Sequence, residues 1–267
     1  MKRATLYLAA LLGLVPTLAL AHGENGHAAD PNLHVDPGLK DCSVDFAPGL
    51  TQVAFRRFAR EFGSASAFTL MAPPTTLGRG HVAFALDVTS FSVEEKADAW
   101  NDTFSHPDDR HELGSRRQFP KLRLRAGLSD RADLGVFYTA NPNANYGWFG
   151  IEGRYALWRQ DGTTPVSVVA RGAWTKTLYV DDIDLQAATG DLEAGRTFWN
   201  VFTPYAGVGT TVVVVRETTD SVDLHSETLQ IPHVLGGAEL RWWRFSLGGE
   251  VRASALTTFE VQLATIF

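Results

Sequence analysis

The chain has 267 residues, of which 45% are hydrophobic, and its formal net charge is −6. This acidic balance argues against nucleic-acid partners, which bind basic surfaces. The single cysteine, Cys42, excludes an intramolecular disulfide, so an apolar core or a hydrogen-bond ladder must hold the fold.

The N-terminus has the pattern of an export signal. Lys2 and Arg3 precede an apolar run from Leu6 to Leu20, and Ala19-Leu20-Ala21 forms a small-x-small cleavage site. We therefore predict a signal peptide at residues 1–21. The apolar run is short for a transmembrane helix, and no later segment reaches the roughly 18 unbroken apolar residues that such a helix needs.

Residues 22–48 are rich in His, Gly, Asp, Asn and Pro and have almost no periodic apolar pattern. We predict a disordered periplasmic leader. The leader contains the most metal-like cluster in the sequence, formed by His22, His27, His34, Asp30 and Asp36. Imidazole suits copper, zinc or nickel, but this spacing matches no closed site. A solvated tail is the favoured interpretation, and we predict no metal and no cofactor.

Residues 49–78 are predicted to form a short amphipathic helix over 50–62 and a lead-in to the first strand. The apolar residues at helical spacing are Leu50, Val53, Ala54, Phe58 and Phe62. Arg56, Arg57 and Arg60 gather elsewhere on the helix, and Pro73 and Pro74 end it. Three placements stay open: a cap packed against the following domain, which the pattern favours, a plug in a barrel lumen, or a basic helix on the inner lipid surface.

From residue 79 to the C-terminus the pattern predicts about ten strands, in a range of 8–12. The predicted strands are 80–92, 118–128, 132–141, 146–158, 164–178, 182–198, 203–216, 229–244, 245–254 and 256–267. A bilayer-spanning strand needs about 9–11 residues, and its backbone groups must pair within a closed barrel. We predict an all-β fold, a transmembrane antiparallel up-and-down β-barrel at 79–267.

The links between strands alternate in length, as expected for a barrel whose first strand starts in the periplasm. The even links at 129–131, 160–162, 199–200 and 243–244 are short, whereas the odd links at 93–117 and 217–228 are long and polar. Aromatic residues gather at strand ends. The periplasmic rim is predicted to hold Trp158, Phe198, Trp199, Phe202, Trp242, Trp243, Phe245 and Phe267, and the opposite rim Tyr138, Tyr146, Trp148 and Tyr179.

Charged residues keep to one face of most strands, and this face must be the lumen because Arg or Lys at the lipid midplane costs about 2–4 kcal/mol. The predicted lumen charge network comprises Lys121, Arg123, Arg125, Asp133, Glu152, Arg154, Arg171, Glu239, Arg241, Glu250, Arg252 and Glu260. The sixth strand departs from this rule, because Asp191 and Glu193 share a parity with Ile183 and Leu185. A bulge or an early end near Gly190 would restore the phase.

Three stretches carry a family resemblance. Residues 125–136, which contain a Gly-Leu-x-Asp turn, residues 203–209 and residues 62–80 resemble segments of bacterial outer-membrane β-barrels, including uncharacterised small proteobacterial proteins. The resemblance covers about 50–267. It implies cell outer-membrane residence and sometimes passive transport, and it carries no catalytic residues. In such a protein the C-terminal Phe267 is expected to act as the insertion signal for the barrel-assembly machinery.

The function stays open between two classes. The favoured hypothesis is a narrow or plugged barrel that passes or binds a small molecule. The alternative is a structural or adhesive barrel whose loops at 93–117 and 217–228 contact outer-membrane lipid or other proteins. A lipid-modifying enzyme is less favoured: it would use His225 and Ser226 with Asp223 or Glu227 at the rim, and no Gly-x-Ser-x-Gly motif supports it.

Overall fold

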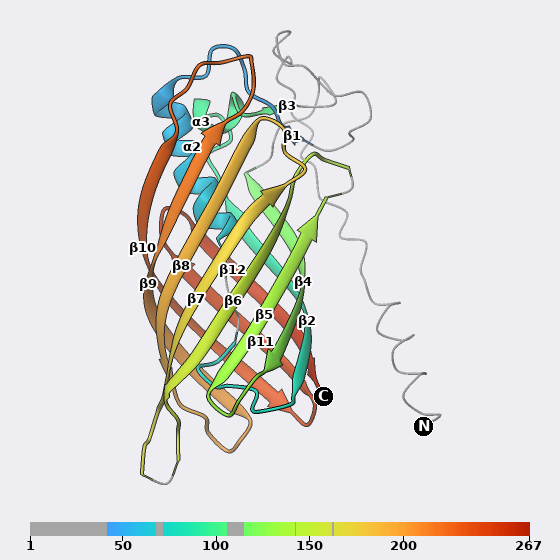
Figure 1. The fold of residues 1–267 in the computed structure, drawn as a ribbon, viewed down its shortest axis with the longest axis vertical. Coiled ribbons are helices and arrows are strands. Elements are labelled where there is room, and N and C mark those ends of the chain that lie inside the picture. Colours follow the sequence, from blue (N-terminus) through green and yellow to red (C-terminus); the bar gives the residue numbers. More distant parts are fainter. Residues whose placement is uncertain (1–41, 68–71, 106–114, 142, 162) are drawn as a thin grey trace, which may run out of the picture.

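The structure, a computed structural model, describes residues 42–67, 72–105, 115–141, 143–161 and 163–267. Ten antiparallel strands close into one barrel, in the order β10-β11-β12-β2-β4-β5-β6-β7-β8-β9 (Figure 1). The predicted fold and strand number are confirmed. The predicted signal peptide and the cluster of His22, His27, His34, Asp30 and Asp36 lie outside the described residues.

The strands of the barrel follow the predicted ranges closely. They are β2 Val82–Ser92, β4 Arg116–Gly127, β5 Ala132–Ala140, β6 Gly147–Trp158, β7 Ser167–Leu178, β8 Ile183–Gly195, β9 Phe202–Glu217, β10 Glu227–Trp242, β11 Phe245–Ala253 and β12 Thr257–Ile266. The last strand pairs with the first, from Thr258 opposite Phe91 to Ile266 opposite Ala83. Phe267 and Val82 add two backbone hydrogen bonds of 2.8 and 3.1 Å, so the C-terminal residue belongs to the closing ladder.

The two ends of the barrel differ. One end, here called the C-terminal end, holds Phe267 and the links 128–131, 159–166, 196–201 and 243–244 (Figure 1). The other, here called the long-loop end, holds the links 93–115, 141–146, 179–182, 218–226 and 254–256. The link predicted at 160–162 is longer than expected. Asp161 folds it into a turn by accepting hydrogen bonds from the backbone N–H groups of Thr163 and Thr164, both 2.7 Å.

Four short elements complete the described chain: β1 Ser43–Val44, α2 Gln52–Ser66, α3 Asp98–Asn101 and β3 Phe104–Ser105. β1 pairs with β3 at the long-loop end, and Cys42, Val44 and Phe46 are buried there. The prediction of a disordered leader is therefore wrong for residues 42–48. That prediction rested on the absence of a periodic apolar pattern, and a strand of two residues is too short to produce one. In the part of the chain that the structure describes, no helix has the length and apolar character to span a membrane.

The outside of the barrel is apolar. Large hydrophobic side chains at least 36% exposed point outward from the strands, among them Phe84, Leu86, Leu122, Leu124, Leu134, Ile151, Leu192, Val208, Val234, Leu247, Val251, Phe259, Val261 and Leu263. Trp158, Trp199, Trp242, Trp243 and Phe267 are exposed around the C-terminal end. Such an exterior with aromatic ends suits hydrocarbon flanked by two interfaces.

The prediction is wrong for two of the four aromatic residues assigned to the opposite rim. Tyr138 and Tyr179 are exposed, and their hydroxyl oxygens lie 3.1 Å apart, whereas Tyr146 and Trp148 are buried in the interior. Trp148 packs edge-on against Phe119 with ring centroids 4.5 Å apart. Trp148 points into the barrel because successive side chains of a strand point to opposite faces, and its neighbour Phe149 is the partly exposed one.

The interior changes from apolar at the long-loop end to charged toward the C-terminal end, which explains β8. Ile183, Leu185, Asp191 and Glu193 all point inward and are at most 7% exposed. Their ladders to β7 and β9 run without a register shift. The expectation of a bulge or early end near Gly190 is therefore wrong. One face of β8 faces an apolar core first and an ionic layer afterwards.

Candidate functional site: the filled lumen

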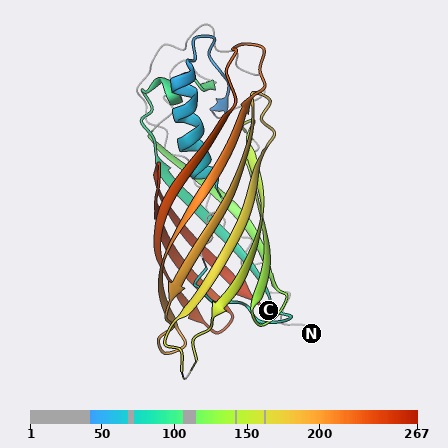
Figure 2. The ribbon, with the colours of Figure 1, turned by 60° about the vertical axis from the view of Figure 1, so that its left-hand side comes forward.

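Helix α2 enters the lumen from the long-loop end (Figure 2). Thr51 starts the helix by accepting a hydrogen bond from the backbone N–H of Ala54, 3.3 Å away. The apolar ridge of Phe55, Phe58 and Phe62 is 0–1% exposed and packs among aromatic residues of the loops and strands. Every residue of the last turn, from Phe62 to Ser66, is buried.

The last turn of α2 lies against the inner face of β9. A Cβ built on Gly63 would lie 2.7 Å from both γ-carbons of Val213, so only a glycine fits without displacing the strand residue. The hydroxyl of Ser64 is in hydrogen-bond contact with that of Ser254 in the turn between β11 and β12. Of the three placements that the sequence left open for this helix, a plug in the barrel lumen is the one that fits this geometry. A helix lying on a lipid surface does not describe it, because the apolar ridge of α2 packs against aromatic residues inside the barrel.

The chain before α2 is tied to two loops of the long-loop end. The Asn145 side chain makes two hydrogen bonds to the backbone of Val44. Its Oδ1 accepts from the Val44 N–H at 2.8 Å, and its Nδ2 donates to the Val44 carbonyl at 2.7 Å. Asp182 accepts a hydrogen bond of 2.9 Å from the Phe46 N–H. Burial raises the pKa of the Asp182 carboxyl above its usual value, and the Phe46 hydrogen bond opposes this shift.

After α2, residues 72–79, here called the strap, descend the lumen to the first strand. Arg154 Nη2 donates to the carbonyl oxygens of Pro73 at 2.8 Å and Ala72 at 3.3 Å. Both oxygens of Asp133 accept from the Leu77 N–H, at 3.1 and 3.2 Å. Two residues of the predicted lumen network therefore bind the chain that fills the lumen.

Five of the predicted charges lie in two clusters on different parts of the wall, together with residues that were not predicted. The first ionic cluster joins β12, β2 and β4 and comprises Asp87, Lys121, Arg123, Glu260 and Gln262. Arg123 Nη2 lies 2.7 Å from Asp87 and 3.1 Å from Glu260, whose other oxygen is 3.5 Å from Lys121 Nζ. Gln262 Nε2 donates to Asp87 at 2.8 Å. All five residues are at most 6% exposed, so the positive and negative groups share a dry environment.

The second ionic cluster joins β6, β7, β8 and β10 and comprises Arg154, Arg171, Asp191, Glu193 and His233. Asp191 is its centre: one oxygen lies 2.6 Å from Arg171 Nη2, and the other lies 2.5 Å from His233 Nε2. Glu193 lies between Arg171 at 3.5 Å and Arg154 at 3.4 Å. This cluster continues into the strap through Arg154.

The other predicted lumen residues lie outside these two clusters. Arg125 lies 3.9 Å from Asp133, and Arg252 lies 3.9 Å from Glu250, which accepts a 3.0 Å hydrogen bond from Tyr205. The predicted residues Glu152 and Glu239 are also buried, at 2% and 5% exposure. Arg241 departs most from the prediction, since its side chain is 34% exposed and pairs with Glu239 on its own strand at 3.3 Å.

Five buried polar residues of the two clusters were absent from the predicted set: Asp87, Asp191, Glu193, His233 and Gln262. Parity within β2 and β12 places Asp87 and Gln262 inward, so this signal was present in the sequence. His233 also lies in the lumen, 5% exposed. Asp191 and Glu193 were hidden by the apparent conflict with Ile183 and Leu185.

One small void lies beside the strap in the ionic half of the lumen. A void of about 20 Å³ is lined by Ala72, Arg123, Arg125 and neighbouring residues of β2, β10, β11 and β12. One water molecule needs about 10–15 Å³. A wider vestibule of about 400 Å³ lies at the C-terminal end, lined by Pro74, Thr75 and Thr76 of the strap and by the links 159–166 and 196–201. Three strap residues therefore form part of the vestibule wall.

The residues considered for catalysis do not converge on one another. His225 and Ser226 are exposed in the link before β10. Glu227 is buried and instead binds α2: its carboxylate lies 3.0 Å from Arg56 Nε and accepts from Gln52 Nε2 at 2.6 Å. Among the residues that the structure describes, no group of three His, Cys, Asp or Glu side chains could hold a metal ion.

A closed antiparallel barrel with an apolar exterior and a charged interior defines a transmembrane β-barrel. The resemblance read from the sequence is thus confirmed at the level of the fold.

The sequence matches no protein-family model and no curated protein. Solved structures similar in fold include an outer-membrane channel from Pseudomonas putida F1, at 11% identity over 75% of this chain and 100% of that chain, with a TM-score of 0.46. The attachment protein Ail of Yersinia pestis matches at 9% identity over 71% of this chain and 99% of that chain, with a TM-score of 0.32. The KdgM porin matches at 9% identity over 68% and 98%, with a TM-score of 0.33. These similarities are confined to the barrel architecture.

Proposed function

We propose that this protein is an outer-membrane barrel held closed by its own N-terminal segment, and that it acts through its long-loop end as a structural or contact protein. One observation carries the proposal: α2 and the strap together occupy the lumen from one end toward the other. In this proposal the export signal at 1–21 delivers the chain, and the C-terminal end faces the periplasm.

The packing of α2 supports a permanently closed state. Burying Phe55, Phe58 and Phe62 contributes roughly 1.5–3 kcal/mol each, or about 5–9 kcal/mol together. A displacement that exposes all three side chains would lose this contribution, which opposes thermal release of the helix. Thermal release of the helix does not supply a useful pore.

A gated passage for a small molecule is the second candidate, and the ion pairs of the lumen favour it. Each of these lumen ion pairs joins two residues on the same strand, on adjacent strands, or on strands separated by one other strand. The charges therefore line the wall and leave the centre to the strap. If a partner withdrew the strap and α2, charged walls would remain around a path that starts at the vestibule.

Conductance in planar bilayers separates the two candidates. The full chain is compared with a deletion of residues 42–75 and with the matched surface variant Val53→Ala, each shown to be folded by a heat-dependent shift in gel mobility. We expect the full chain and Val53→Ala to be electrically silent. Discrete openings of the full chain would refute the closed barrel. Steady conductance of the deletion variant shows that the assay detects an emptied lumen, and silence there as well indicates a barrel without a path.

A further inference from the structure

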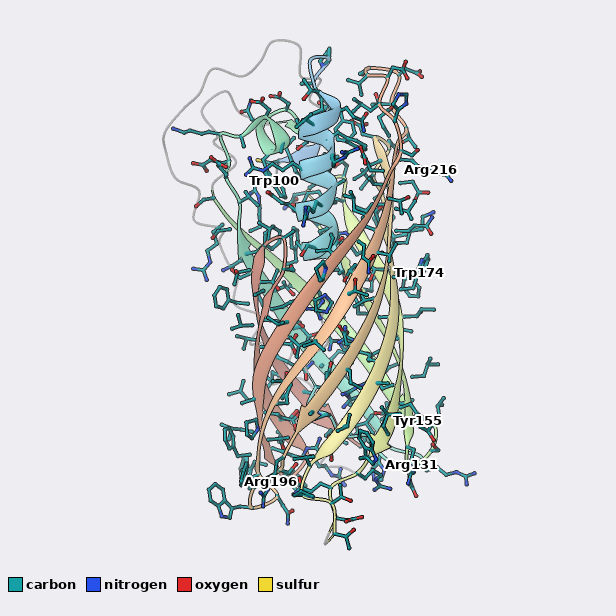
Figure 3. All side chains as sticks on the ribbon, turned by 90° about the vertical axis from the view of Figure 1, so that its left-hand side faces the viewer. Trp100, Arg131, Tyr155, Trp174, Arg196 and Arg216 are labelled. Atoms are coloured by element: carbon teal, nitrogen blue, oxygen red, sulfur yellow. The ribbon has the colours of Figure 1, made fainter. Side chains whose placement is uncertain are left out.

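The barrel wall is uneven, and α2 stands beside its longest strands and above a short hairpin. β9 and β10 have 16 residues each, whereas β11 has 9 and β12 has 10. Figure 3 shows α2 above the short hairpin of β11 and β12, beside Trp100 and next to the tall strands. The contact between the Ser64 and Ser254 hydroxyls fixes the height of the helix on the hairpin turn. On this side the helix continues the wall.

The outward face of α2 is basic. Val53 is 80% exposed, the Arg56 and Arg57 side chains are 63% and 43% exposed, and Arg60 is also exposed. Arg56 Nε forms an ion pair of 3.0 Å with Glu227. Arg57 forms two ion pairs, one of 2.9 Å from its Nε to Glu61 and one of 2.7 Å from its Nη2 to Glu94. These pairs hold the guanidinium groups at the surface in a chain whose net charge is −6.

The lower part of this basic face, at Arg60, lies at the height of the headgroup region of a membrane, and Arg56 and Arg57 lie just beyond it. Val251 and Phe259 are the large exposed apolar residues nearest to the hairpin turn on either side. In the proposed placement, hydrocarbon therefore ends near that turn. With a rise of about 1.5 Å per residue, Arg60 lies about 6 Å above Ser64, and Arg56 and Arg57 lie about 11 Å above it. The polar layer of a bilayer extends roughly 5–8 Å beyond the hydrocarbon on each side.

We propose that Arg56, Arg57 and Arg60 of α2 bind the phosphate groups of membrane lipid headgroups at the long-loop end. The inference rests on the proposed placement of the barrel in a membrane and names the partner of its long-loop end. A guanidinium offers a planar fork of donors that matches phosphate oxygens in two parallel hydrogen bonds. Arg60 at headgroup height, with Arg56 and Arg57 just beyond it on the same exposed helix face, presents such forks to the outer side of the headgroup layer.

The test measures binding of fluorescent phosphatidic acid to the full chain in uncharged detergent micelles, with phosphatidylcholine as the comparison lipid. The variant is Arg57→Gln with Arg60→Gln. The matched control is Arg131→Gln, an exposed arginine at the C-terminal end (Figure 3). Two lost surface ion pairs should weaken phosphatidic acid binding about tenfold. The control should not change it, and all variants should keep the heat-dependent gel shift.

Equal weakening by the variant and the control, or no weakening by either, would overturn the proposal. Competition by millimolar inorganic phosphate as strong as that by unlabelled phosphatidic acid would overturn it too, because the site would then recognise a free anion. The variant should remain electrically silent in planar bilayers. Conductance there would refute the closed barrel and leave the lipid-binding result to stand on its own.

Discussion

The close contact between Gly63 and Val213 allows a quantitative test of the plug. An alanine at position 63 places its Cβ 2.7 Å from the two γ-carbons of Val213, a fully buried residue on a strand paired on both sides. Overpacking of this kind costs about 1–3 kcal/mol. In an open helix the same substitution would stabilise by up to about 1 kcal/mol. The variant Val213→Ala removes the clashing carbons and should restore the helical gain.

The predicted quantity is therefore the coupling between the two positions. Gly63→Ala, Val213→Ala and the double variant are unfolded by urea in lipid vesicles and followed by tryptophan fluorescence. We expect an interaction energy of about 1–3 kcal/mol, with Gly63→Ala destabilising or neutral alone and stabilising beside Val213→Ala. Gly49→Ala, at a position with open space, is the control and should be additive with Val213→Ala. Additivity of Gly63→Ala within about 0.5 kcal/mol would refute the placement of α2 on β9.

Three further predictions concern other parts of the molecule. Leu122→Arg on the lipid face should destabilise the barrel by about 2–4 kcal/mol in vesicle unfolding, although the adjacent Lys121 is tolerated inside; an unchanged midpoint would contradict the assigned faces. Asp182→Asn keeps an acceptor for the Phe46 N–H. Because burial raises the pKa of Asp182, the folded state binds its proton more tightly than the unfolded chain and loses stability as the pH rises through this titration. The variant should therefore unfold later than the parent at pH 7 and together with it near pH 3, where the parent carboxyl is protonated in both states; the opposite order at pH 7 would contradict this. Deleting Phe267 should lower the amount of folded barrel in the outer membrane without creating conductance, and normal insertion would contradict its role as a signal.

Strand alternation predicted the barrel because the period of two is local and strong. Arg123, Arg125 and Arg154 each alternate with outward-facing residues, and the structure places all three in the lumen. Closure through Phe267 followed from the same reasoning. Residues on β8 were harder to assign, because the rule of a polar lumen does not hold where α2 fills the barrel. Ile183 and Leu185 are inward and apolar for that reason.

The plug itself could be predicted only as one of several placements. The spacing of Phe58 and Phe62 reveals an amphipathic helix, but the surface that it covers is formed by residues far along the chain, such as Val213 and Trp148. The strap has no periodic signal, and its position depends on Arg154, Asp133 and the missing side chain of Gly127. A Cβ on Gly127 would lie 1.9 Å from the Gly78 carbonyl oxygen. Such long-range complementarity is not visible in a single sequence.

Crosslinking in the membrane tests the filled lumen most directly. In a Cys42→Ser background, Ser64→Cys with Ser254→Cys pairs two side chains whose hydroxyls are in contact, one on α2 and one in the turn between β11 and β12. The control pair is Val53→Cys with Ser254→Cys, because Val53 is 80% exposed and lies eleven residues farther up the helix. We predict that mild oxidation of intact outer membranes closes the first pair into a disulfide, seen as a reducible change in gel mobility, and leaves the control pair open. A folded barrel in which the first pair stays reduced, or in which both pairs react equally, would contradict the plug.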